Sequence, residues 1–295
     1  MKTYGEERNY NLNPFDENIY QGQQPTCAVR SQEIILRDYG IIVPQEELAK
    51  FAEANGWYNP DLATGGTPPD CVGNILEACG VEVKHSENNT VFDLVNELSQ
   101  GHRVIVGVDA DELWADTWLE KAAAKFTDIF RQEGNHALIV AGVEVNPNDI
   151  NDVKVILTDP GKGDLRIEYD IKEFMDAWQD AKCTMVSTTK PAPYQYNADT
   201  QEMEFSQFAV NADFASNDNH FTNEFNTADL DFNHYNPMFD DGHLDYINGM
   251  SYSDYVHHYL TNPAFLETFF YDNPVTDMSD DIMFNTITPN DIPLL

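Results

Sequence analysis

The sequence predicts an α+β fold, in which helices pack on a mostly antiparallel sheet. Stretches with helical periodicity dominate the first hundred residues, and several of them stop at a glycine. The pattern then changes to apolar, β-branched runs of strand length. Because the helices come first and the strands follow as a group, we expect the strands to pair with one another and to carry the helices on the resulting sheet.

Start and stop signals mark the expected helices. The first begins near Cys27, with Thr26 as its expected N-cap, and stops before Gly40. Pro44 precedes the second helix, and Thr90 is the expected cap of a later one. We therefore predict helices over residues 27–39, 45–55, 69–79, 91–100 and 171–181.

The strands are predicted from alternating or continuous apolar runs. A polar arm over residues 1–20 is expected to lie on the domain, and an insertion with helical periodicity, residues 110–133, interrupts the sheet. The predicted strands cover residues 81–85, 103–109, 136–145, 153–159, 164–170 and 183–189.

Charge divides the chain into two parts. The net charge is −35, from 16 Lys and Arg against 51 Asp and Glu. All Lys and Arg lie within 1–190, whereas 191–295 holds 18 acids and no Lys or Arg. We expect a folded domain over 1–190. Over 191–295 we expect an acidic, aromatic- and Asn-rich tail that is disordered or folds conditionally, for example on a protein partner.

The acidity also limits what the protein can bind. Nucleic acid is held through clustered Lys and Arg, and no such patch is visible, so it is not expected as a partner. An anionic membrane surface is disfavoured for the same reason. A cationic partner remains compatible with the charge, so a basic peptide or protein is the expected kind of substrate.

Cysteine use favours a reducing compartment. The four cysteines are irregularly spaced, and no CxxC pair indicates a metal site, so neither a metal nor another cofactor is expected. The first twenty residues lack the apolar segment of a signal peptide, and no stretch is long enough to span a membrane. A cytoplasmic location is therefore predicted.

Three residues far apart in the sequence predict a thiol-based site. Cys27 opens a helix, where the dipole and free N–H groups favour a thiolate. His136 begins an apolar strand and could take the thiol proton, and Asp159 ends another strand and could orient the imidazole. Gln21 lies six residues before the cysteine and could donate to an oxyanion together with the backbone N–H of Cys27.

Each of these residues alone also has a simpler interpretation. Such a cysteine is often a packing residue, such a histidine often belongs to a core, and an Asp before Pro-Gly is often a turn residue. Gln23 or Gln24 could replace Gln21 if the loop has a different shape. The combination and its chain order are what favour catalysis.

A second group of residues could contact substrate. Asp109 and Asn135 flank the ends of predicted strands, and Trp57 lies in a turn-rich loop. Asp109 is followed by Asp111, Glu112 and Trp114, which could line the cleft, bind a basic side chain or hold calcium, although the spacing is not that of an EF-hand. A solvated acidic loop and an anchoring role for Trp57 and its neighbour Tyr58 are the alternatives.

The segments GQQPTCAVRSQEIILRDYG, NHALIVAGVE and ILTDPG resemble those of papain-like peptidases related to the bacteriocin-processing domains of peptide exporters. The resemblance covers about residues 15–190. It implies a papain-like fold and a cysteine peptidase with Cys27 as nucleophile, His136 as base, Asp159 as orienting residue and Gln21 as oxyanion donor. Exporter-attached members usually have Asp then Cys-Gly where this chain has Thr26-Cys27-Ala28, so cleavage after a double glycine is not expected. The alternative is a non-catalytic adaptor that binds peptides on the same fold, with the tail as an interaction arm.

Overall fold

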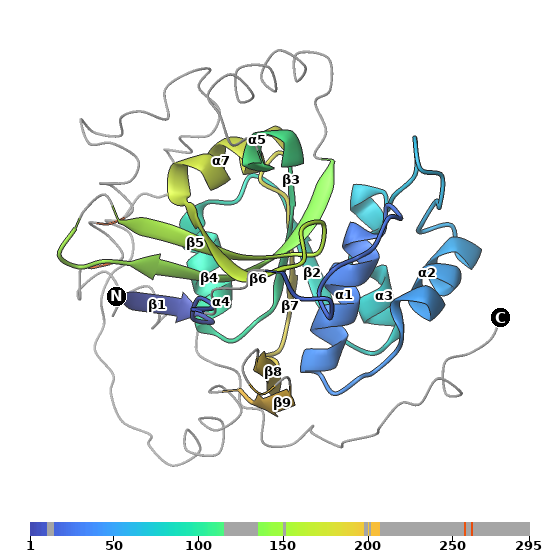
Figure 1. The fold of residues 1–295 in the computed structure, drawn as a ribbon, viewed down its shortest axis with the longest axis horizontal. Coiled ribbons are helices and arrows are strands. Elements are labelled where there is room, and N and C mark those ends of the chain that lie inside the picture. The colour runs from blue at the N-terminus through green and yellow to red at the C-terminus, as the bar shows by residue number, and fades with distance from the viewer. Residues whose placement is uncertain are drawn as a thin grey trace, which may run out of the picture.

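A computed structural model describes residues 1–10, 15–114, 135–149, 152–197, 200, 202–206, 257 and 261 (Figure 1). Within this part of the chain, a large antiparallel sheet stands beside a layer of N-terminal helices. The expected α+β class is confirmed.

The sheet has the strand order β2-β7-β3-β4-β5-β6, and β1 pairs with β4 beside this path. All of its pairings are antiparallel. The strands are β1 (Lys2–Gly5), β2 (Val83–Ser86), β3 (Val104–Val108), β4 (His136–Val145), β5 (Val153–Asp159), β6 (Asp164–Asp170) and β7 (Met185–Thr188).

Helices cover both faces of this sheet. Along β3, Val104 and Val106 face one cluster of buried side chains, and Ile105 between them faces the other. This alternation is the period-2 pattern of a strand buried on both faces. The first cluster contains α4 (Val91–Ser99) and α7 (Ile171–Asp180), and the second contains α1 (Cys27–Asp38), α2 (Gln45–Ala54) and α3 (Asn74–Ala78).

Hydrogen bonds from one buried side chain fix α1 against α3. The Gln32 side chain accepts backbone N–H bonds from Gly73, Ile75 and Leu76, and its own amide donates to the carbonyl of Ala28. These bonds satisfy helix-end groups that would otherwise be buried without partners. They also set the position of the first turn of α1.

Three segments differ from the sequence-based prediction. The helix expected over 69–79 is divided into a 3-10 turn, η1 (Pro69–Cys71), and α3, because Gly73 between them has a φ of +102° that a continuous helix cannot contain. The polar N-terminal arm contains β1. Beyond residue 190, β8 (Tyr194–Asn197) and β9 (Glu202–Phe205) form a hairpin.

Other expectations fall wholly or partly outside the described residues. Of the insertion over 110–133, the structure describes α5 (Ala110–Trp114) and nothing beyond it. The tail past residue 206 is described only at 257 and 261. In the described part of the chain the four cysteines are free thiols, and no group of side chains there could hold a metal ion. None of the helices described is both long and apolar enough to cross a membrane.

Candidate active site

The thiol of Cys27 lies at the first position of α1, where the backbone N–H groups of a helix are free to stabilise a negative charge. Thr26 occupies the N-cap position as predicted, but its hydroxyl makes no capping bond to the helix. The Thr26 hydroxyl instead accepts a hydrogen bond of 3.0 Å from the side-chain amide of Gln45 on α2. Cys27 itself is half-buried.

The sheet brings the predicted imidazole and carboxylate together. His136 begins β4 and Asp159 ends β5, and these two strands are antiparallel neighbours, so the start of one lies beside the end of the other. The Nε2 atom of His136 lies 2.6 Å from Oδ1 of Asp159. The His136 ring and the Cys27 thiol also lie near enough for each to shift the pKa of the other. A sulfur, an imidazole and a carboxylate thus form one connected row.

Asp159 is fully buried, and its carboxylate is hydrogen-bonded from three sides. Oδ1 accepts from His136 and from the backbone N–H of Gly161 at 2.8 Å, and Oδ2 accepts from Nε1 of Trp114 at 2.8 Å. A buried carboxylate without such partners would be costly. The bonds therefore explain how an ionised Asp can stand at the buried end of a strand.

The electrostatics favour a thiolate–imidazolium pair. Burial alone would raise the pKa of the Cys27 thiol, but the hydrogen bond and charge of His136, with the backbone N–H groups of Ala137 and Ala28, lower it below its ordinary value. Burial would lower the pKa of His136, but its bonds to Asp159 and Cys27 outweigh this and raise that pKa to about 10. Burial likewise opposes ionisation of Asp159, yet its bonds to His136, Trp114 and Gly161 lower its pKa.

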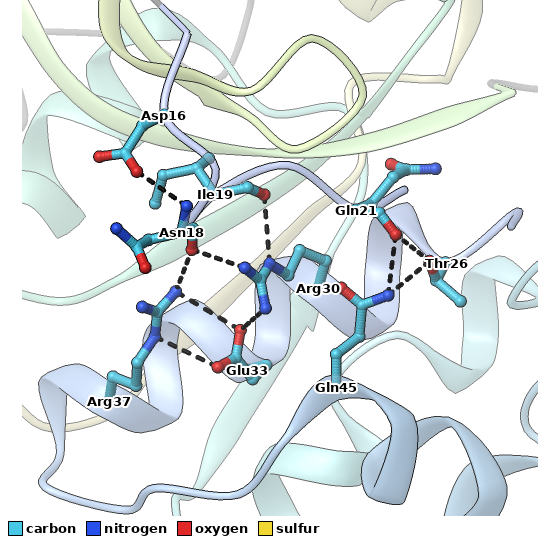
Figure 2. A network of polar contacts seen from close by, with 9 residues as sticks. All are labelled: Asp16, Asn18, Ile19, Gln21, Thr26, Arg30, Glu33, Arg37 and Gln45. Atoms are coloured by element: carbon cyan, nitrogen blue, oxygen red, sulfur yellow. Dashed lines mark hydrogen bonds and ion pairs between the residues drawn. The ribbon is translucent and has the colours of Figure 1, made fainter. Parts of the chain in front are cut away.

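The loop that carries Gln21 is held over α1 by ionic and polar contacts (Figure 2). The guanidinium groups of Arg30 and Arg37 both donate to the backbone carbonyl of Asn18, at 2.6 and 2.8 Å. Arg30 also donates to the carbonyl of Ile19. Glu33 lies between the two arginines and pairs with both. The first helix therefore fixes the path of the chain just before residue 21.

Gln21 is joined to the site through its backbone. Its N–H donates to the carbonyl of Pro160, next to Asp159, at 2.9 Å, and its carbonyl accepts from Gln45. Its side-chain amide donates to the carbonyl of Gln24, and its Oε1 atom is buried with no partner among the described residues. Gln23 and Gln24 were the alternatives to Gln21 as oxyanion donor. The side-chain amide of Gln23 donates to the hydroxyl of Tyr20 at 3.0 Å, and Gln24 is exposed.

The three residues expected to contact substrate make contacts with other parts of the protein. Asp109 is only 4 % exposed, and its carboxylate accepts from the backbone N–H of Asp111 and from the Asn135 amide. Asn135 in turn accepts from the backbone N–H of Ala110. Both thus fasten α5 to the residue before His136. Trp57 packs edge-on against Phe51.

Sequence reasoning did not identify the roles of Trp114 and Gly161. Trp114 was expected at most to line the cleft, but it bonds Asp159 and lies edge-on to His136 with ring centroids 5.0 Å apart. A Cβ placed on Gly161 would lie 2.9 Å from both the His136 ring and the Trp114 ring. The Asp-Pro-Gly turn carried a signal for Gly161, since a glycine often marks a close approach.

Cys27, His136 and Asp159 thus lie together on an α+β fold, and the family of the chain follows from comparison with known proteins. The model of the Peptidase_C39 like family matches residues 15–186, so the chain belongs to this family of cysteine peptidases. No curated protein matches the sequence. Among solved structures, one described as a C39-like peptidase from Bacillus anthracis is 16% identical, with a TM-score of 0.44. The match covers 63% of this chain and 99% of that one.

Proposed function

We propose that the protein is a cysteine peptidase that cleaves a peptide or isopeptide bond through an acyl-enzyme on Cys27. The observation that carries the proposal is the row formed by Cys27, His136 and Asp159, with the 2.6 Å contact between imidazole and carboxylate. Membership of the Peptidase_C39 like family supports it independently.

Cys27 and His136 carry out the two stages of the proposed reaction. The Cys27 thiolate attacks the carbonyl carbon of the scissile bond, and the His136 imidazolium gives its proton to the leaving nitrogen as the C–N bond breaks. This leaves a thioester on Cys27 and a neutral imidazole. His136 then takes a proton from water as the water attacks the thioester, the acid product leaves, and the thiolate–imidazolium pair is restored.

Two donors would stabilise the oxyanion. The backbone N–H of Cys27 lies at the helix start, and the Gln21 amide has a second hydrogen besides the one donated to Gln24. The anchored loop supports this role, because an oxyanion donor must be held in place before the reaction. Gln21→Ala is expected to lower the rate of the chemical step by about 10²–10³-fold, the usual cost of losing such a donor.

The substrate is proposed to be a basic peptide or protein. The net charge of −35 would attract cationic chains and repel acidic ones. Peptide libraries cleaved by the wild type and by Cys27→Ala, compared by mass spectrometry, test this assignment. Cleavage seen only in the wild type, enriched beside Lys and Arg and weakened by salt, would support it. Cleavage with no such enrichment would refute the preference for basic substrates but would still support peptidase activity.

Alkylation by iodoacetamide at neutral pH tests the site itself, and the protein contains its own control. Cys71 is also partly exposed, but burial and the neighbouring Asp70 raise the pKa of its thiol. We expect Cys27 to react much faster than Cys71, and this advantage to disappear in His136→Ala. Equal rates at the two thiols in the wild type would favour the adaptor, which binds peptides without cutting them.

A further inference from the structure

The contacts around Asp159 extend beyond the three residues of the proposed mechanism. Trp114 donates its indole N–H to Oδ2 of Asp159 at 2.8 Å, while Oδ1 receives His136 and the backbone of Gly161. Each carboxylate oxygen therefore has its own donor. A carboxylate held at both oxygens cannot turn about its last side-chain bond without breaking a hydrogen bond.

The indole also packs directly on the imidazole. The two rings meet edge-on, with centroids 5.0 Å apart and an interplanar angle of 62°. Gly161 completes the packing, since its missing side chain leaves room for both rings at once. The His136–Asp159 contact is thus enclosed by an aromatic ring on one side and a turn on the other, which strengthens its electrostatics by excluding water.

The position of this indole is itself built into the fold. Trp114 ends α5, and the first turn of α5 is tied to the chain before His136 through Asp109 and Asn135. The backbone of Asp109 additionally donates to the carbonyl of Ala177 on α7. The element that carries the indole is therefore anchored to the strand that carries the imidazole and to a core helix.

From these contacts we infer that Trp114 is a positioning residue of the site. It fixes the Asp159 carboxylate through its N–H and shields the carboxylate–imidazole bond with its ring. This inference rests on the proposed function, because it assigns Trp114 a task only if His136 activates Cys27. This role acts through Asp159 and His136 and requires no contact of the indole with the sulfur or the substrate.

Trp114→Phe tests the N–H separately from the ring. Phenylalanine keeps an aromatic edge near His136 but cannot donate to Asp159. We expect the rate–pH profile of Cys27 alkylation to move up by about one pH unit, so that at a fixed pH on the rising part of the profile the rate falls about tenfold. The whole rate–pH profile should shift to higher pH, which a merely structural loss would not produce.

Trp178→Phe is the matched control. Trp178 also donates its indole N–H, in this case to the carbonyl of Thr184 at 2.9 Å within the core. The Trp178→Phe substitution should lower the melting temperature without moving the rate–pH profile of Cys27 alkylation. An equal shift in both variants would show that any loss of packing acts on the thiol, and would overturn the inference.

Two failures can be told apart. If wild-type Cys27 reacts no faster than Cys71, the proposed function itself fails. If wild-type Cys27 is activated and Trp114→Phe has an unchanged profile, only the role of Trp114 fails.

Should Trp114→Phe not fold, the indole N–H can be followed with Trp114 in place. This N–H should exchange slowly with solvent in the wild type and faster in Asp159→Asn, by a larger factor than the N–H of Trp178, which reports the general loss of stability. The same exchange rate in both would contradict the bond on which the inference depends.

Discussion

At the scale of single residues, the site depends on three buried charged groups that stabilise one another. Cys27 and Asp159 have lowered pKa values and His136 has a raised one, although burial opposes the charged form of each. Such a group is stable only while its partners are present. Removing one charge should therefore affect both reactivity and folding.

Asp159→Asn keeps the shape of the side chain and removes its charge. We expect the pKa of His136 to fall, Cys27 to lose its high reactivity at neutral pH, and the free energy of unfolding to decrease by about 3–5 kcal/mol, as when a buried pair is broken. Denaturant unfolding and alkylation rates on the same samples measure both effects. Unchanged reactivity would show that the carboxylate does not act on the imidazole.

The dependence of stability on pH follows from His136. Its folded pKa of about 10 lies above the ordinary value of 6.5, so its contribution is complete below about pH 6.5 and is lost as pH rises through 10. In His136→Ala this alkaline loss should be absent. Thermal unfolding of both proteins between pH 6 and about 10.5 checks the sign, and parallel curves would contradict it.

Gly161→Ala should damage the site more than the fold. The added Cβ would lie 2.9 Å from the His136 and Trp114 rings, so the imidazole must move. Overpacking of this kind costs about 1–3 kcal/mol, but a small displacement of the ring should abolish rapid alkylation of Cys27. Gly107→Ala is the control, since its Cβ would meet the side chains of Thr184 and Ala181 instead. Loss of reactivity in both variants would argue against a specific effect on His136.

At the scale of elements, local patterns predicted much of the structure, and some pairings distant in sequence were missed. The starts of α1 and β4 and the end of β5 were predicted, because caps and periodicity are local signals, and these ends carry Cys27, His136 and Asp159. The contact between Trp114 and Asp159 spans 45 residues, so no local pattern encodes it. β1 was missed because a four-residue strand with polar neighbours is defined mainly by its partner, β4.

The anchored loop before α1 allows a test at this scale. Glu33 bridges Arg30 and Arg37, which together hold the carbonyl of Asn18 (Figure 2). In Glu33→Gln we expect the Gln21 N–H, bonded to Pro160, to exchange faster with solvent, because the two arginines lose their shared partner. Hydrogen exchange measures this, with the capped N-terminus of α4 as an internal reference. Equal protection of Gln21 in both proteins would show that the ion pairs do not hold the loop.

At the scale of the whole molecule, the fold continues past the matched family region and past the change in composition at residue 190. The backbone of Ala192 donates to Gly101, the carbonyl of Tyr194 accepts from the buried Arg103, and the Ser206 hydroxyl donates to Ala192. Composition could not show this, because the hairpin β8–β9 shares the polar, aromatic character of the residues after it.

A chain shortened after residue 190 should consequently be less stable than one shortened after residue 206. The shorter form lacks the hairpin, so Arg103 loses one of its hydrogen-bond partners and the surface beneath the hairpin is exposed to solvent. We expect the free energy of unfolding to fall by about 2–4 kcal/mol, the sum of a few hydrogen bonds and some buried surface. Denaturant midpoints of the two forms provide the comparison. Identical midpoints would mean that the hairpin contributes nothing to the fold.

The most direct test of the account is a pH titration of the Cys27 thiolate by its ultraviolet absorbance, taken as the difference between wild type and Cys27→Ser and repeated in a His136→Ala background. We expect wild-type Cys27 to ionise clearly below the ordinary thiol pKa, and the midpoint to move up to or above that value without the imidazole. The same midpoint in both backgrounds would contradict it, since His136 would then have no part in forming the thiolate.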